Sequence, residues 1–179
     1  MPKVINFNNK LDNINSIITL GNFDGVHLGH KQLINNLIDK RLEKTGLSSI
    51  LITFNPHTQF VINRNKKFKL IDSYEFKIKQ LKKYNIDYIS IIDFDKSFSK
   101  LSAKDFIDTI VRKYNPSSII IGYDSKFGYK GEGDYTFLKK YLSRHDIDVL
   151  QNKSYSYNGE IIKSSFIKRL IEKGDIESV

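Results

Sequence analysis

Two histidines three positions apart carry the clearest chemical signal in this sequence. His27 and His30 flank Gly29 and follow the pair Asp24-Gly25. Apolar residues at helical spacing come next, so the segment is expected to open a helix after a short β-branched run. The unpaired N–H groups and the positive dipole of a helix start favour phosphate groups. We therefore predict that both imidazoles donate hydrogen bonds to the phosphates of one ligand. The alternative is that they only cap the helix and pack.

The glycines around these histidines favour a site where the backbone lies close to a ligand. Gly21, Gly25 and Gly29 carry no side chain that would hold a ligand away. Their spacing is not that of a P-loop, and the segment lacks the GxGxxG pattern of dinucleotide-binding proteins. The pattern thus indicates phosphate binding without pointing to either of those families.

The elements that must position this site alternate between strands and helices. The expected strands are residues 16–20, 49–54, 87–92, 118–121 and 146–151, and helical spacing recurs within 33–42, 73–84, 102–111, 137–142 and 164–173. This alternation predicts an α/β fold, a Rossmann-like parallel sheet of about five strands with helices on both faces. Ligands of such sheets bind beyond the carboxyl ends of the strands, which places the loops 21–29, 55 onward and 122–133 at the site.

Local signals mark where several elements begin and end. Caps are expected at the starts of three helices, formed by Ser73 with Asp72, by Ser102 with Asp105, and by Ser164 or Ser165. The last helix is expected to end at Gly174. Asn158-Gly159 predicts a hairpin turn. Residues 57–69 show no clear period and are predicted to form a functional loop.

Composition excludes several classes of protein. The chain has 179 residues, so residues 1–179 are expected to form one domain. It contains no cysteine, which excludes disulfides and thiolate catalysis, and no apolar stretch long enough for a membrane span. No apolar signal sequence is visible at the N-terminus, so the expected location is cytoplasmic.

The charge balance is strongly basic, with 29 basic and 20 acidic residues and a net charge of +9. A polyanionic partner such as nucleic acid would suit this balance. The lysines are scattered, however, and accompany many Ile and Asn residues, which favours compositional bias as the cause. We therefore expect no nucleic acid and no membrane as partner. A modest positive field would still help a phosphate-bearing substrate to bind.

Four segments resemble the motifs of one enzyme family. Residues 27–30 (HLGH) have the HxGH form of the nucleotidylyltransferase superfamily. The longer segment 21–30 (GNFDGVHLGH) resembles the first motif of the FMN adenylyltransferase (FAD synthetase) module of bacterial bifunctional riboflavin kinase/FAD synthetases. Residues 53–57 (TFNPH), 122–134 (GYDSKFGYKGEGD) and 162–168 (IKSSFIK) resemble its later motifs in the same order. The resemblance spans nearly the whole chain.

The sequence departs from these family motifs at five positions. Thr58 stands where proline is usual, Ser125 where an aromatic residue is usual, and Gly131 where arginine is usual. Lys163 replaces the first serine of the last motif, and Lys168 replaces its arginine. Lysine keeps the charge of arginine but loses the two parallel hydrogen bonds of a guanidinium. These departures affect the expected rate and affinity more than the fold. A homologue with weakened activity or a changed function therefore remains an alternative.

The resemblance implies an enzyme that joins ATP and FMN into FAD and pyrophosphate, with Mg²⁺ as its metal ion. It implies that His27, His30 and Lys168 are the catalytic residues. The implied ATP-binding residues are Gly21, Asn22, Phe23, Asp24, Gly25, His27, Gly29, His30, Ser164, Ser165 and Lys168. The implied FMN-binding residues are Asn55, Pro56, His57, Asp124, Lys126, Phe127 and Gly128, with Asn55 also as metal ligand.

Other functions remain open at this point. The same superfamily includes enzymes that use nicotinamide mononucleotide or phosphopantetheine as acceptor. The departures at Gly131, Lys163 and Lys168 would also suit a non-catalytic flavin- or nucleotide-binding module. The bifunctional proteins carry a riboflavin kinase module after this point. Because nothing in the chain resembles that module, we expect the chain not to phosphorylate riboflavin, and a separate kinase module is a candidate partner.

Overall fold

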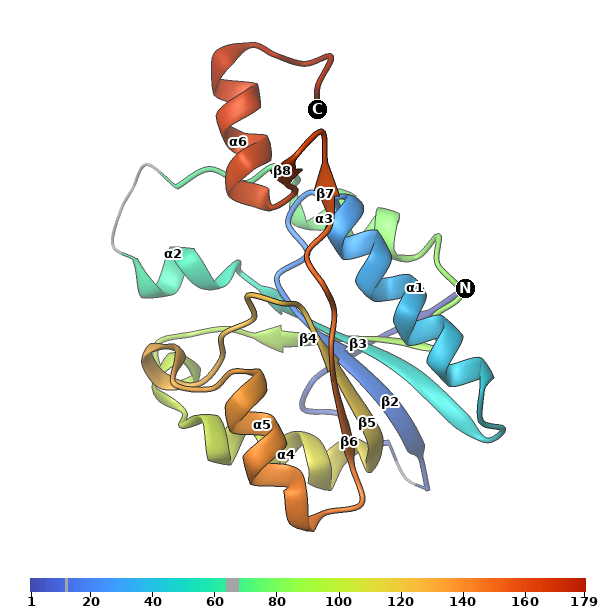
Figure 1. Ribbon diagram of the computed structural model, residues 1–179. Coiled ribbons are helices and arrows are strands. Elements are labelled where there is room, and N and C mark those ends of the chain that lie inside the picture. Colours follow the sequence, from blue (N-terminus) through green and yellow to red (C-terminus); the bar gives the residue numbers. More distant parts are fainter. Residues whose placement is uncertain (12, 64–67) are drawn as a thin grey trace.

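A parallel sheet forms the centre of the structure, a computed structural model that describes residues 1–11, 13–63 and 68–179 (Figure 1). The strand order is β1-β4-β3-β2-β5-β6, and every neighbouring pair is parallel. The strands are β1 (Lys3–Asn6), β2 (Asn15–Leu20), β3 (Leu47–Asn55), β4 (Tyr88–Asp93), β5 (Pro116–Ile121) and β6 (Asp148–Gln151). The predicted Rossmann-like α/β fold is confirmed.

Helices cover both faces of this sheet because neighbouring residues of its strands point to opposite sides. Ile17 and Ile18 are neighbours on β2, and they belong to two separate apolar clusters on opposite faces of the sheet. The helices are α1 (Leu28–Leu42), α2 (Thr58–Ile62), α3 (Tyr74–Leu81), α4 (Ala103–Tyr114), α5 (Tyr135–Tyr141) and α6 (Ser164–Lys173). The described residues also form three short 3₁₀ turns: η1 (Phe98–Lys100), η2 (Tyr129–Gly131) and η3 (Leu142–Arg144). Burying both faces explains why the strands read as continuous apolar runs.

The order of the strands places a crevice above the middle of the sheet. β2 lies between β3 and β5, so the chain leaves β2 toward one side of the sheet and later returns to build the other side. Connections that diverge in this way open a crevice at the carboxyl ends of the strands, where ligands of α/β proteins bind. The loops after β2 and β5 flank that crevice, as predicted.

The structure corrects four expectations about individual elements. The sheet has a sixth strand, β1, which the sequence did not reveal because it is short, half-exposed and at the sheet edge. Part of the predicted loop 57–69 is the helix α2, while residues 64–67 lie outside the described residues. The helix after Ser73 ends at Leu81, before Tyr84. Neither Ser164 nor Ser165 caps the last helix, because Lys163 occupies the N-cap position without a side-chain hydrogen bond.

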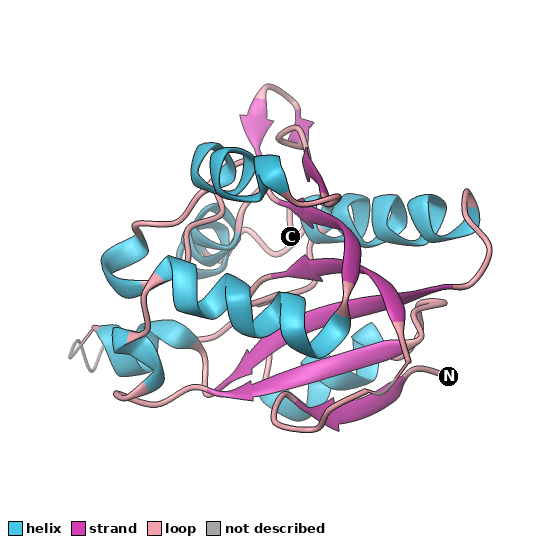
Figure 2. Ribbon diagram, turned by 90° about the horizontal axis from the view of Figure 1, so that it is seen from below, coloured by secondary structure: helices cyan, strands magenta, loops and turns pink. Residues whose placement is uncertain are grey.

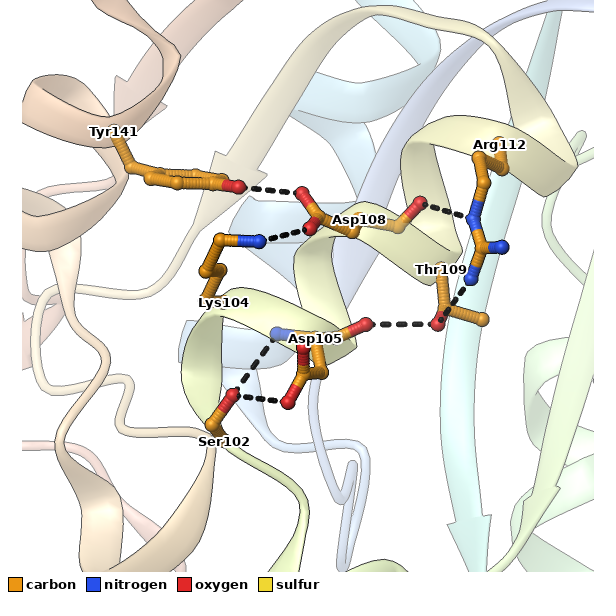
Figure 3. Close-up of polar contacts among 7 residues, drawn as sticks. All are labelled: Ser102, Lys104, Asp105, Asp108, Thr109, Arg112 and Tyr141. Atoms are coloured by element: carbon orange, nitrogen blue, oxygen red, sulfur yellow. Dashed lines mark hydrogen bonds and ion pairs between the residues drawn. The ribbon is translucent and has the colours of Figure 1, made fainter.

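The predicted cap of α4 is present and sits beside the contact between α4 and α5 (Figure 3). The Ser102 hydroxyl accepts a hydrogen bond from the Asp105 amide at 3.1 Å. One helical turn further along, Asp108 accepts hydrogen bonds from the Tyr141 hydroxyl at 2.6 Å and from Lys104 at 2.8 Å. Tyr141 thereby attaches α5 to α4, and both helices stay on the same face of the sheet.

The chain leaves the sheet after β6 through a small hairpin, β7 (Ser156–Tyr157) and β8 (Glu160–Ile161), which projects from the body of the molecule (Figure 2). Asn158 and Gly159 both have positive φ, as the predicted turn requires. The hairpin leads into α6, which lies over the carboxyl ends of the strands (Figure 1). Among the described residues, no helix combines the length and apolar character needed to cross a membrane.

Candidate active site

Most of the predicted site residues lie around one cavity of about 840 Å³ at the carboxyl edge of the sheet. Those that line it are Gly21, Asn22, Phe23, His27, Gly29, His30, His57, Asp124, Lys126, Phe127, Gly128, Ser164 and Ser165. A second pocket of about 70 Å³ lies beside it, and the predicted site residues on its wall are Asn22, Asp24, Asn55, Pro56 and His57. Gly25 and Lys168 line neither of these two pockets.

His27 and His30 form a stacked pair at the start of α1. His27 is the N-cap residue, and its Nδ1 accepts a hydrogen bond from the His30 amide at 3.4 Å. The two ring centroids are 3.6 Å apart with the planes 19° from parallel, and the His30 ring also packs on Phe23. Because Nδ1 of His27 acts as an acceptor, the proton of the neutral ring is on Nε2, which can donate to a ligand.

Burial keeps this histidine pair uncharged near neutral pH. It lowers the pKa of His27 from 6.5 to about 4, although the charges of Asp124 and Asp24 act in the opposite direction. Burial, together with the charges of His27 and Lys77, holds the pKa of His30 well below its ordinary value. The pair therefore offers neutral N–H donors and a helix dipole to a phosphate group.

The histidine pair makes stability depend on pH. Because the pKa of His27 is lower in the folded chain than in the unfolded one, the unfolded chain takes up a proton first on acidification. We expect the free energy of unfolding to fall as the pH drops from 6.5 to about 4. Urea unfolding above pH 6.5 and again near the lower limit measures this. His27→Asn, which keeps an N-cap acceptor, should reduce the fall, and an equal fall in both proteins would contradict the prediction.

The loop after β3 brings a third histidine to the cavity. His57 is the N-cap residue of α2, where its Nδ1 accepts a hydrogen bond from the Gln59 amide at 3.2 Å. Its ring lies against Phe68, with 4.8 Å between the centroids. Burial lowers its pKa to about 4. Asn55 ends β3, and its carbonyl accepts a hydrogen bond from the Phe94 amide at 2.9 Å.

The loop after β5 closes on itself beside the cavity. Phe127 and Gly133 exchange two backbone hydrogen bonds of 3.0 and 2.9 Å, and the Phe127 ring is buried. Lys126 is exposed and pairs with Asp134 at 2.8 Å, so much of its charge is already matched. Asp124 is exposed at the cavity wall. The loop thus contributes one buried aromatic ring and two exposed charged side chains to the cavity.

Gly128 lets this loop pass against the start of α4. Its φ is +73°, and a Cβ at this position would lie 2.5 Å from the Ala103 nitrogen. We expect Gly128→Ala to lower the free energy of unfolding by at least about 2 kcal/mol. Gly46 is the matched control, since its φ is +79° but a Cβ there meets nothing within 4 Å. Gly46→Ala should lower the free energy of unfolding only through backbone strain. If denaturant unfolding shows the same loss of stability in both variants, the close contact with Ala103 is not its cause.

The last predicted motif attaches α6 to the first one. The Ser164 hydroxyl donates to the Asp24 carbonyl at 3.0 Å. Lys168 forms an ion pair of 2.7 Å with the buried carboxylate of Asp24, and its ammonium lies 4.0 Å from the centre of the Phe68 ring. The other Asp24 carboxylate oxygen accepts hydrogen bonds from the backbone amides of Ile71 and Asp72. Lys168 is therefore engaged with Asp24 and does not point its charge into the large cavity.

Sequence reasoning missed one residue of this region, Lys77 of α3. Lys77 is only 5% exposed, and its ammonium donates to one acceptor in the loop after β2 and to two at the end of β3. Burial lowers its pKa to about 8, with the charge of Asp24 opposing the change. A signal was available: Lys77 shares the helical spacing of Tyr74, Ile78 and Leu81, which puts it on the buried face.

The metal-ligating side chains of this region do not gather into a metal site within the described residues. The part of the chain that the structure describes contains no group of three or more His, Cys, Asp or Glu side chains that could hold a metal ion. The buried carboxylate of Asp24 is already matched by Lys168 and two backbone amides. The residues present therefore do not form a closed protein cage for a cation.

The fold and the site define the class of this protein. A parallel sheet of this order, with an HxGH helix start at its carboxyl edge, is the architecture of a Rossmann-like nucleotidylyltransferase.

Comparison with known proteins identifies the family. The family model described as FAD synthetase matches residues 9–166, and the chain therefore belongs to the FAD synthetase family. Relatives named bifunctional riboflavin kinase/FMN adenylyltransferase are 38% identical in Buchnera aphidicola subsp. Schizaphis graminum and 32% identical in Listeria monocytogenes. These matches cover 95% and 92% of this chain but 55% and 52% of the relatives. The chain thus spans about half the length of the curated relatives it matches.

A solved structure shares the fold. The crystal structure described as a macrolide-efflux protein from Streptococcus pneumoniae matches with a TM-score of 0.84 and 23% identity. The match covers 99% of this chain and 68% of that one. At this level of identity the likeness supports the architecture alone.

Proposed function

We propose that the chain is an FMN adenylyltransferase that makes FAD and pyrophosphate from FMN and ATP. The observation that carries the proposal is one cavity into which all four motif segments open, in a chain of the FAD synthetase family. Its volume of about 840 Å³ is near the upper end of ligand pockets, as two ligands side by side require. The proposed reaction is an attack by an oxygen of the FMN phosphate on the α-phosphorus of ATP. The bond from that phosphorus to the bridging oxygen breaks, and pyrophosphate leaves.

The polar part of the cavity suits the phosphates of ATP. His27, His30 and the start of α1 face this part, and Ser164 and Ser165 approach it from α6. In this proposal the neutral imidazoles donate hydrogen bonds to phosphate oxygens as charge moves onto the leaving group. Gly21, Phe23, Asp24 and Gly25 shape the pocket around the adenylyl group. Lys168 must release Asp24 before it can reach a phosphate.

The apolar part of the cavity suits the flavin ring. Five phenylalanines on its wall form a contiguous cluster in which successive ring centroids are 5.5 to 6.0 Å apart: Phe54, Phe94, Phe98, Phe106 and Phe127. Phe127 and Gly128 come from the loop after β5, and His57 lines the same cavity. We place the FMN phosphate near Asn55, Pro56 and His57, with Asp124 and Lys126 at the flavin side.

Mg²⁺ fits this site as an ion carried by the ATP phosphates. Mg²⁺ commonly keeps several waters and binds through substrate phosphates and one or two protein oxygens. The amide of Asn55, at the carboxyl end of β3, is the side chain that we propose as its protein ligand. When bound, the ion would neutralise charge on the triphosphate.

The assay that tests the proposed function follows FAD and pyrophosphate chromatographically from purified protein, ATP and Mg²⁺. FMN should support turnover, whereas nicotinamide mononucleotide and phosphopantetheine should not. Turnover with another acceptor would replace FMN in the proposal, and binding of FMN and ATP without product would identify a non-catalytic module.

The names of the relatives also suggest the context of the reaction. Because those proteins combine riboflavin kinase with FMN adenylyltransferase, we propose that a riboflavin kinase activity supplies the FMN. The use of ATP and the absence of cysteine favour the cytoplasm as the compartment.

A further inference from the structure

Two loops of the cavity are held together by one buried ammonium group. Nζ of Lys77 lies 3.2 Å from the carbonyl oxygen of Asn22, 3.2 Å from the hydroxyl of Thr53 and 3.1 Å from the carbonyl oxygen of Phe54. A lysine ammonium has three N–H donors, so these contacts use all of them. Asn22 belongs to the loop after β2, and Thr53 and Phe54 belong to the end of β3. Lys77 therefore spans two strand ends from a third element, α3.

A second set of hydrogen bonds joins the same two loops. The side-chain amide of Asn22 donates to the Thr58 hydroxyl at 3.0 Å, and the Thr58 backbone N–H donates back to the Asn22 amide oxygen at 3.2 Å. The Thr53 hydroxyl also donates to the Asn22 carbonyl at 3.2 Å. Proline, usual at position 58 in the motif that this segment resembles, has neither an N–H nor a hydroxyl and could form neither Thr58 bond. The exchange with Asn22 thus depends on the departure at Thr58.

These hydrogen bonds lie next to the residues that we expect to bind the ligands, so they do more than stabilise the core. The loop that contains Asn22 continues into His27 and His30, and Thr58 directly follows His57. All three histidines line the same cavity. The bonds around Asn22 therefore fix the distance between the two walls on which we place the two phosphate-bearing substrates.

We propose that Lys77 and Thr58 act through Asn22 as a loop clamp, formed by Asn22, Thr53, Phe54, Thr58 and Lys77, that positions the ATP-binding loop relative to the FMN-binding loop. These are positioning residues, since the bonds described above are to the protein itself. The inference rests on the proposed function and deepens it. In-line transfer needs the attacking oxygen and the α-phosphorus aligned, and a displacement of about 1 Å can cost about 10²-fold in rate. Each loop can still bind its own ligand when the clamp is broken.

Lys77→Met tests the clamp because it removes the three donors and keeps an unbranched chain of similar size. Lys79→Met on the exposed side of the same helix is the matched control. We expect the dissociation constants for ATP alone and for FMN alone to change by less than about 3-fold, and kcat to fall by about 10- to 10²-fold. An unchanged kcat would overturn the proposal, as would a loss confined to the binding of one ligand.

Thr58 provides a series that does not depend on the buried lysine. Thr58→Ser keeps both bonds to Asn22, Thr58→Val keeps the N–H alone, and Thr58→Pro keeps neither. Position 58 is the first residue of α2, where proline is well tolerated. We expect kcat to fall in that order, from near wild type for Ser to about 10-fold lower for Pro. The losses of Lys77→Met and Thr58→Pro should not add in the double variant, since both act through Asn22. Equal activity of the Ser and Pro variants would remove Thr58 from the clamp.

Amide hydrogen exchange without ligands tests the clamp independently of FAD formation. In Lys77→Met, protection should fall together in segments 21–30 and 53–62, while helix α4 should keep its protection. A change in neither segment, or a uniform loss across the chain, would overturn the clamp. If wild-type protein makes no FAD, the proposed function fails, and the exchange result still decides whether the two loops are coupled.

Discussion

Replacing His30 by alanine should slow FAD formation by at least about 10²-fold, the scale of losing one hydrogen-bond donor that stabilises charge in the transition state. The His30 ring stacks on His27 at 3.6 Å and packs on Phe23, so it is held in one orientation before any ligand arrives. A donor held in advance needs no reorganisation when charge develops on the phosphates. The effect should fall on kcat more than on the affinity for ATP.

Two further variants separate this role from packing. His30→Asn keeps a small polar donor and should retain more activity than His30→Ala. His145 is exposed and lies far along the sequence after α5, so His145→Ala should have wild-type kcat. Turnover of His30→Ala within a few-fold of wild type, in a folded protein, would refute the assignment of His30.

Replacing Asp24 by alanine should cause the largest loss of stability, about 3 to 5 kcal/mol, the range found when one partner of a buried ion pair is removed. The Asp24 side chain is 2% exposed. Its carboxylate forms an ion pair with Lys168 and accepts hydrogen bonds from the backbone amides of Ile71 and Asp72. Its removal leaves a partly buried ammonium and two backbone donors without their acceptor. Denaturant unfolding measures the loss.

The control for this variant is an exposed ion pair with a similar distance between nitrogen and oxygen. Lys104 and Asp108 are 2.8 Å apart, and the Lys104 side chain is 60% exposed. Lys104→Met should lower the free energy of unfolding far less than Asp24→Ala does, because solvent screens an exposed pair. Asp24→Asn, which keeps an acceptor oxygen for the backbone amides, should fall between the two. If Asp24→Ala unfolds no more easily than Lys104→Met, then the contact between Asp24 and α6 is not a stabilising one.

The sheet, and the edge of it at which the site lies, could be predicted because the sequence patterns that indicate them are local. Continuous apolar runs such as Ile17 and Ile18 mark strands buried on both faces, and the order of strands and helices then fixes which loops share an edge. Ser102 at the start of α4 and Asn158-Gly159 in the hairpin follow from local hydrogen bonding and backbone preference, and both predictions are confirmed. The roles of individual site residues stay predictions.

What the sequence did not show depends on contacts between distant segments. β1 forms only because it pairs with β4, more than 80 residues later in the sequence. The ion pair of Lys168 with Asp24 joins the last motif to the first, and no local sequence pattern predicts a contact between segments so far apart. The helical spacing of Lys77 indicates a buried face, but its three acceptors come from the loop after β2 and the end of β3, so no local pattern shows which groups it binds.

The most direct test of the proposed activity follows the phosphorus atoms of ATP. Purified protein is incubated with FMN, Mg²⁺ and ATP labelled either at the α- or at the γ-phosphate. Adenylyl transfer predicts that the α-label enters FAD, that the γ-label leaves in pyrophosphate, and that one pyrophosphate forms for each FAD. Label from the γ-phosphate in a flavin product, or bound FMN and ATP without any transfer of the α-label, would contradict the account.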